Sequence, residues 1–145
     1  MKNKKIIGRD SYADFPGFGL AKVPVKVDSG AYTSTIHCSK IKLLEENKLE
    51  VVFLDKKSAA FTGEKVVFDE FETRKIRSSS GESQKRFTVK GTITLQGKTY
   101  KTRFTLSKRD KMKYPVLLGR RLLNKRFLID PSITEVKNGG KKLTN

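Results

Sequence analysis

Short apolar runs separated by turn-forming residues dominate the chain, and several of them alternate strictly with polar positions. Residues 21–27 alternate at period two, which predicts a β-strand. Its inward face would carry Ala21, Val23, Val25 and Val27. The strand runs directly into Asp28-Ser29-Gly30, where glycine permits a sharp change of direction. We therefore expect a carboxylate on a turn at the end of a strand.

Two β-hairpins are predicted in the middle of the chain. Residues 73–76 and 86–90 form the arms of the first, around a tip of small residues at 78–81. Residues 92–95 and 99–106 form the second, joined by a turn that contains glycine. The small residues of the first tip predict that this hairpin is mobile.

A shorter excursion precedes these hairpins. Residues 51–54 and 66–68 are β-type runs that indicate a hairpin or a local excursion from the main sheet. Residues 41–49 mix apolar and charged positions and are compatible with a short helix or an irregular connection.

The last third of the chain predicts a strand, a helical turn and a second strand. Residues 116–118 are fully apolar, 120–125 fit one or two helical turns, and 127–129 return to a strand pattern. The polar tail at 137–145 is expected to be flexible. Many short strands with turns between them predict an all-β fold, a small β-barrel.

Length and composition favour one packed domain that spans residues 1–145. A chain of 145 residues can bury a single core, and 9 Phe with 4 Tyr supply large apolar groups. The single cysteine, Cys38, cannot form an internal disulfide, which fits a reducing compartment. No apolar run has the length of a signal core or a membrane span, so a cytoplasmic protein without membrane contact is expected.

The net charge of +17 is concentrated in the second half of the chain. Residues 1–72 hold 12 Lys or Arg against 11 Asp or Glu, whereas residues 73–145 hold 20 against 4. Such a field attracts polyanions and raises their local concentration. Charge alone does not distinguish a phosphodiester backbone from a run of carboxylates.

The Asp28-Ser29-Gly30 triplet is the candidate catalytic motif. Two carboxylates that share a proton can activate water for amide hydrolysis, with one acting as base and the other as acid. The chain has one such triplet, so the second carboxylate would come from another subunit of a symmetric homodimer. An ordinary turn stabilised by the Asp side chain explains the triplet equally well when it is taken alone.

Two further segments, in order along the chain, resemble parts of retropepsin-like aspartic peptidases. Leu118-Gly119-Arg120 is similar to the segment that precedes the C-terminal helix and lies beneath the catalytic turn in that class. Residues 75–82 occupy the position of the flap that closes over a bound peptide. The resemblance implies a small closed acid-protease barrel with a flap hairpin and one short C-terminal helix, which hydrolyses peptide bonds.

The resemblance extends to a bacterial family labelled as ATP-dependent zinc proteases, whose members accompany ATP-grasp amino-acid ligases such as the ribosomal-protein glutamate ligases. The matching segments are 7–9, 26–37, 74–82, 109–112, 115–120 and 130–131. Two positions depart from the family pattern, with Ser29 in place of the usual Thr and Tyr32 in place of a common Arg. Serine keeps the hydroxyl, whereas the lost cation would change substrate preference.

This resemblance implies roles for particular residues and partners. Substrate contacts would come from Ala31, Tyr32, Arg77, Ser78, Ser79, Ser80, Gly81 and Glu82. Leu118, Gly119 and Arg120 would support the turn, with Arg120 tying the helix to the loop after Asp28. The basic charge together with the family association favours acidic, glutamate-rich peptides as substrate. An ATP-grasp ligase or a ribosomal protein would then be a partner.

Neither zinc nor ATP is expected as a cofactor, despite the family label. Catalytic zinc needs about three His, Cys, Asp or Glu ligands, and the chain offers one His37 beside one Cys38. Neighbouring residues on a strand point to opposite faces, so these two would not bind one ion. The sequence also lacks a Gly-rich loop followed by Lys and Ser or Thr, the usual cradle for nucleotide phosphates.

Two other functions stay open at this stage. The pI of about 10.1, with aromatic residues interleaved with Lys and Arg in 86–104, is typical of a non-catalytic nucleic-acid-binding β-barrel. A retropepsin-like domain that keeps the dimer and has lost activity would serve as an adaptor for a ligase.

Overall fold

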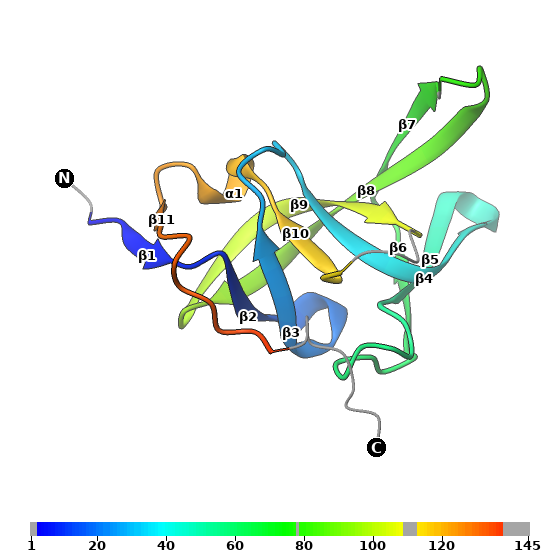
Figure 1. Ribbon diagram of the computed structural model, residues 1–145. Coiled ribbons are helices and arrows are strands. Elements are labelled where there is room, and N and C mark those ends of the chain that lie inside the picture. Colours follow the sequence, from blue (N-terminus) through cyan, green and yellow to red (C-terminus); the bar gives the residue numbers. More distant parts are fainter. Residues whose placement is uncertain (1–2, 78, 109–112, 138–145) are drawn as a thin grey trace.

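A closed β-barrel forms the centre of the fold (Figure 1). The computed structural model describes residues 3–77, 79–108 and 113–137. Its strands are β1 (Lys5–Ile7), β2 (Asp10–Phe15), β3 (Leu20–Val27), β4 (Ser34–Leu44), β5 (Lys48–Phe53), β6 (Lys65–Phe68), β7 (Glu72–Arg77), β8 (Ser83–Leu95), β9 (Lys98–Ser107), β10 (Val116–Leu118) and β11 (Phe127–Ile129). Among these strands, β10, β3, β2, β8, β9 and β4 are neighbours in that order, and β4 pairs back to β10, which closes the ring. The predicted all-β barrel is confirmed.

Helical structure in the described residues is brief. The short α-helix α1 (Arg120–Leu123) follows β10, as the sequence predicted, and ends sooner than the predicted 120–125. Two 3-10 turns, η1 (Pro16–Phe18) and η2 (Glu45–Asn47), connect strands. No helix in this part of the chain is long and apolar enough to cross a lipid bilayer.

Phenylalanine rings fill the barrel interior. Phe18 stacks on Phe53 with ring centroids 4.3 Å apart, and Phe15 meets Phe104 edge to face at 5.5 Å. Gly91 in β8 makes room for this cluster, because a Cβ there would lie 2.5 Å from the Phe18 ring. The interior is therefore a packed core.

The strand β10 runs between β3 and β4 and fixes the end of both. It pairs in parallel with β3, where Leu118 lies opposite Val27, and antiparallel with β4, where Val116 lies opposite Ile36. A strand in this position is paired on both sides, which explains its fully apolar sequence. It delivers α1 to the back of the turn that follows Val27.

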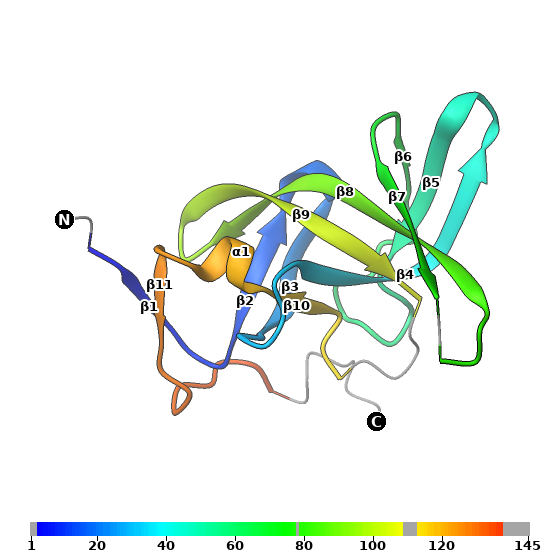
Figure 2. The ribbon, with the colours of Figure 1, turned by 90° about the horizontal axis from the view of Figure 1, so that it is seen from above.

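Two excursions leave the barrel (Figures 1 and 2). β8 is one continuous strand, so its first half pairs with β7 in a projecting hairpin and its second half belongs to the barrel. The two hairpins predicted from the sequence therefore share a strand. On a separate edge, β4 extends outward and pairs with β5, which in turn pairs with β6.

The expectation of a helix or irregular connection over 41–49 is wrong. β4 continues through Leu44, η2 turns the chain, and β5 returns antiparallel with Leu43 opposite Leu49. An ion pair of 2.9 Å between Lys40 and Glu50 joins the two strands. Strand pairing thus overrides a local sequence that has no clear period.

The predicted inward face of 21–27 needs one correction. Val23, Val25 and Val27 are buried, but Ala21 is exposed and Leu20 takes the inward place. Lys22 has a φ of 52°, and the register between β2 and β3 shifts at this point. A local bulge therefore breaks the alternation that the sequence suggested.

The two strands β1 and β11 pair in parallel at the end of the molecule opposite the β7–β8 hairpin (Figures 1 and 2). Ile7 and Phe127 face the core, while Ile6 and Leu128 are 58% and 54% exposed. This small sheet therefore leaves apolar side chains in solvent.

Candidate active site

Asp28 lies on a turn that is held by main-chain hydrogen bonds. Its N–H donates to the Leu118 carbonyl at 2.9 Å, which ties the turn to β10. The Gly30 N–H donates to the Asp28 carboxylate Oδ1 at 3.1 Å, and the Ala31 N–H donates to the Asp28 carbonyl at 3.2 Å. The carboxylate is half-buried, with the exposed Ser29 and Gly30 beside it. The turn thus presents a carboxylate to the outside in a fixed orientation.

Gly119 allows α1 to approach this turn closely. A Cβ at Gly119 would lie 2.6 Å from the Tyr32 carbonyl oxygen, too close for any side chain. The Gly119 N–H donates to the buried Ser34 hydroxyl at 3.0 Å. The backbone of β10, α1 and the turn is therefore packed without intervening side chains.

Arg120 also ties α1 to the turn. Its N–H donates to the Ala31 carbonyl at 2.8 Å, and its guanidinium Nη1 donates to the Ser29 carbonyl at 2.9 Å. The same guanidinium lies over the Tyr32 ring at 5.9 Å, and Tyr32 is 56% exposed. The supporting position that the resemblance implied for Leu118, Gly119 and Arg120 corresponds to these contacts.

A cleft of about 450 Å³ opens beside the β7–β8 hairpin, and Asp28 is not among the described residues that line it. Thr33, from the loop after Asp28, forms one wall, while Thr88 and Thr105 form the floor on β8 and β9. Four arginines also line the cleft, namely Arg74, Arg86, Arg103 and Arg121. They come from β7, β8, β9 and α1, so four separate elements direct cations to one place.

The charge of this cleft is only partly neutralised. Glu72 forms an ion pair with Arg103. Among the described residues, no carboxylate lies within ion-pair distance of Arg74, Arg86 or Arg121. Arg74 also lies directly opposite Arg86 across the hairpin, a like-charge pair that is unfavourable in the free protein. A bound anion would relieve this repulsion.

The predicted flap residues occupy the tip of the β7–β8 hairpin. Ser79, Ser80, Gly81 and Glu82 form the exposed turn, and Ser78 lies outside the described residues. Ile76 lines the cleft, so the alternation of the strand turns Arg77 to the opposite face. Within the hairpin it is therefore the stem, rather than the tip, that lines the cleft.

Sequence analysis did not identify Arg86, Arg103 and Arg121 as site residues. The period-two alternation of the second half of the chain is the signal that was available, because it places Arg86 and Thr88 on one face of β8. Arg86 and Arg103 lie near Arg121 only because α1 returns to the barrel, and no local sequence pattern predicts that return. Segment 109–112, which carried part of the resemblance, lies outside the described residues.

His37 and Cys38 are structural neighbours with separate partners. The His37 Nε2 lies 2.9 Å from the Asp55 carboxylate, and its buried Nδ1 has no hydrogen-bond partner among the described residues. Burial raises the pKa of the Cys38 thiol well above its ordinary value, so this cysteine is not a nucleophile. In the described part of the chain no three His, Cys, Asp or Glu side chains cluster, so these residues do not fit a zinc site.

The closed barrel, the projecting hairpin and the Asp-Ser-Gly turn over a buried strand together define a retropepsin-like domain. Residues 6–139 match the sequence profile of the RimB-like family, described as retropepsin-like aspartic endopeptidase RimB. The chain belongs to this family. A protein with unknown function from Legionella pneumophila subsp. pneumophila str. Philadelphia 1 has the same fold, with a TM-score of 0.68 and 23% identity over 91% of this chain and 97% of that one.

Longer proteins contain a segment similar to this chain. A protein named "Probable alpha-L-glutamate ligase" from Shewanella pealeana is 36% identical over 137 residues, which is 90% of this chain and 29% of that protein. A protein of the same name from Desulfotalea psychrophila is 35% identical over 133 residues, again 90% and 29%. This chain thus spans less than a third of the length of these curated relatives.

Proposed function

We propose that this chain is one subunit of a homodimeric aspartic endopeptidase that cleaves acidic peptides. The observation that carries the proposal is the position of Asp28, a carboxylate fixed on an exposed turn whose following loop contributes Thr33 to a cleft lined by four arginines. Membership of a retropepsin-like endopeptidase family supports the same reaction class.

The reaction requires a second carboxylate. In the proposed dimer the two Asp28 side chains share one proton and hold a water molecule between them. The ionised carboxylate takes a proton from the water as the water oxygen attacks the peptide carbonyl carbon. The protonated carboxyl group donates its proton to the carbonyl oxygen. The resulting diol collapses as the amide nitrogen gains a proton and leaves. Ser29 and Gly30 orient the turn, and Arg120 holds it from behind.

The β1–β11 sheet supports the dimer proposal. It exposes Ile6 and Leu128, and the chain from β1 passes directly beside the catalytic turn, where the Val27 N–H donates to the Arg9 carbonyl at 2.9 Å. Large apolar side chains that are exposed together mark contact surfaces. In the proposed dimer a second copy covers this sheet.

The charge of the cleft supports an acidic substrate. Arginine binds carboxylates in a bidentate fashion, and the four arginines come from elements on opposite sides of the cleft. The relatives named as glutamate ligases point to the same chemistry, because a ligase that adds glutamate produces a chain of carboxylates. We extend this to a partnership with an ATP-grasp ligase or with a protein that such a ligase has modified.

Peptide cleavage by wild type and by Asp28→Asn tests the reaction. The substitution should lower kcat by on the order of 10³-fold or more, because it removes the general base and acid of the pair. Asp69→Asn is the matched control, since Asp69 is 78% exposed and lies beyond the barrel on the β5–β6 side. Equal activity of wild type and Asp28→Asn would refute the proposal.

Substrate charge and dimer formation are tested on the same preparations. Oligoglutamate should be cleaved faster than oligolysine or a neutral peptide, and indifference to charge would refute the acidic substrate. Sedimentation should give a dimer that Leu128→Asp converts to an inactive monomer. A fully active monomer would refute the shared site. In the active dimer, kcat against pH should be bell-shaped, with two apparent pKa values that belong to the pair.

A further inference from the structure

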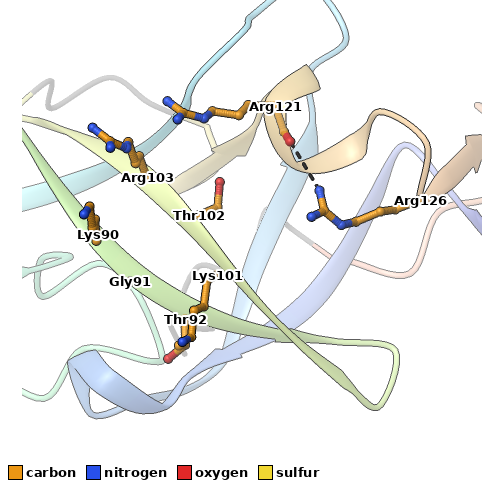
Figure 3. A pocket seen from close by; sticks show the side chains of 8 residues that line it. All are labelled: Lys90, Gly91, Thr92, Lys101, Thr102, Arg103, Arg121 and Arg126. Atoms are coloured by element: carbon orange, nitrogen blue, oxygen red, sulfur yellow. Dashed lines mark hydrogen bonds between the residues drawn. The ribbon is translucent and has the colours of Figure 1, made fainter.

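A second basic pocket lies on the outer face of β8 and β9, next to the cleft (Figure 3). Its volume is about 440 Å³. Its charged lining consists of Lys90, Lys101, Arg103, Arg121 and Arg126, and no carboxylate is among the described residues that line it. We call this hollow the β8–β9 pocket.

The strand register forces like charges together at this pocket. Lys90 on β8 lies directly opposite Arg103 on β9, and Lys101 is the next outward-facing residue on the same strand. Cations in direct opposition across a sheet destabilise it. Arg103 is paired with Glu72, but within the described chain no carboxylate lies within ion-pair distance of Lys90 or Lys101. The pocket is therefore built for an anion that comes from outside.

Part of this cationic lining is already ordered. The Arg126 guanidinium donates from Nη1 to the Leu122 carbonyl at 3.0 Å and lies over the Tyr100 ring at 5.6 Å. Figure 3 shows its bond to the Arg121 carbonyl, with the Arg121 side chain directed toward Arg103. An ordered guanidinium loses less entropy when it binds a carboxylate than a free one does.

The β8–β9 pocket adjoins the cleft. Arg103 and Arg121 line both, so a peptide held in the cleft and extended over these two arginines would reach the pocket. The described lining includes no aromatic residue, whereas single-stranded nucleic acids are held by bases stacked on aromatic rings. The arginines shared with the cleft and the absence of aromatic residues from the described lining both favour a peptide as the ligand.

We propose that the β8–β9 pocket is an exosite that binds carboxylate side chains of an acidic peptide several residues away from the bond that is cut. The proposal rests on the proposed function, since it takes the cleft to be the place of cleavage. In this proposal Lys90 and Lys101 make the protein bind long acidic peptides more tightly than short ones. These two lysines do not line the cleft itself.

Binding of acidic peptides of two lengths to the full chain tests this exosite. Asp28→Asn serves as the background, so that cleavage does not interfere. Fluorescent tetraglutamate, which spans at most about 14 Å, is compared with dodecaglutamate, which spans at most about 40 Å. The pocket variant is Lys90→Ala/Lys101→Ala, and the control is Lys56→Ala/Lys57→Ala, which removes two exposed lysines outside the pocket lining.

The pocket variant should weaken dodecaglutamate binding at least tenfold and change tetraglutamate binding less than twofold. It should also flatten the salt dependence of dodecaglutamate binding relative to the control. Equal losses for both peptides, or equal losses in pocket and control variants, would overturn the exosite. The exosite would also be overturned if an RNA oligonucleotide bound more tightly than dodecaglutamate and the pocket variant lost this RNA binding.

The failures of the two proposals are distinguishable. If wild type hydrolyses no peptide and the length-dependent loss still appears, the β8–β9 pocket stands as a binding site for acidic peptides and the peptidase does not. If wild type cleaves acidic peptides and the pocket variant binds both lengths as the control does, the exosite alone is refuted.

Discussion

The Asp28 turn, whose following loop lines the cleft through Thr33, and the β7–β8 hairpin are held in different ways. The turn is fixed by main-chain bonds to β10 and α1 and by a glycine that leaves no room for a side chain. The strand β7 pairs only with β8, and nearly all of its side chains are exposed. The turn is therefore part of the packed core, while the hairpin is held by one ladder of hydrogen bonds, by the continuation of β8 into the barrel and by the Glu72–Arg103 ion pair.

This difference matches two tasks. A carboxylate that activates water must keep its position within a fraction of an ångström, which requires a rigid scaffold. A cover that admits and releases a peptide must open locally, and elements with few buried contacts do so at low free energy. The cations of the cleft come from the hairpin and from β9 and α1 of the barrel, so a bound acidic peptide would draw the hairpin toward the barrel.

Glycine substitutions should separate the two walls most strongly. Gly119→Ala places a Cβ against the Tyr32 carbonyl, so we expect a loss of about 2–4 kcal/mol in the free energy of unfolding, together with loss of activity. Gly81→Ala at the hairpin tip meets no atom within 4 Å and bears only the strain of its φ of +86°, about 1 kcal/mol. Urea denaturation measures both. Equal losses would mean that the hairpin is as rigid as the turn.

Asp10 tests how far the rigid wall extends. Burial would raise its pKa, but hydrogen bonds from the Glu135 and Val136 N–H groups and the Tyr114 and Thr134 hydroxyls outweigh it and lower the pKa below 3.8. A lowered pKa in the folded state gives stability that is complete above the unfolded pKa, about 3.9, and is lost as the pH falls through the folded value.

We expect Asp10→Asn to cost about 1–2 kcal/mol at neutral pH, where the charged hydrogen bonds are intact. The difference from wild type should shrink as the pH falls through the acidic range. Chemical denaturation at a series of pH values measures it. A difference that is constant with pH would show that the charge of Asp10 plays no part.

Removal of cations from the hairpin should change substrate binding more than stability. Arg74→Ala/Arg86→Ala should raise the KM for an acidic peptide about tenfold, equivalent to about 1.4 kcal/mol, with little change in kcat. Lys75→Ala/Lys85→Ala is the matched control, because this pair lies in the adjacent register position on the opposite face. If both doubles raise KM equally, the effect is one of net charge and not of the cleft.

The smallest effect is expected from the link between α1 and the turn. Arg120→Ala removes the side-chain bond to the Ser29 carbonyl but leaves the main-chain bonds in place. We expect a fall in kcat of roughly threefold to tenfold, since one hydrogen bond contributes about 1 kcal/mol. Arg121→Ala, the neighbour on the same helix, should raise KM instead. A larger loss of stability than of activity would contradict a positioning role for Arg120.

Local patterns predicted much of the barrel and one part of the site. The Asp28 turn, the buried strand at 116–118, the helical turn after Gly119 and the pairs of β-strands all follow from alternation, apolar runs and turn residues within a few positions of one another. Where the local pattern was mixed, as at 41–49, the prediction failed because the partner strand decided the conformation. The side chain of Ala21 faces solvent instead of the core because the next residue, Lys22, has a positive φ that breaks the alternation of the strand.

The sequence by itself determined the basic second half, the Asp-Ser-Gly triplet and the class of fold, since each depends on residues that are neighbours in the chain. Only the tertiary structure brought Arg74, Arg86, Arg103 and Arg121 to one cleft and Lys90 and Lys101 to the pocket beside it. The reason is that strand register and the return of α1 set which distant positions face each other. Which of these distant residues lie close together is a property of the closed barrel and not of any single segment.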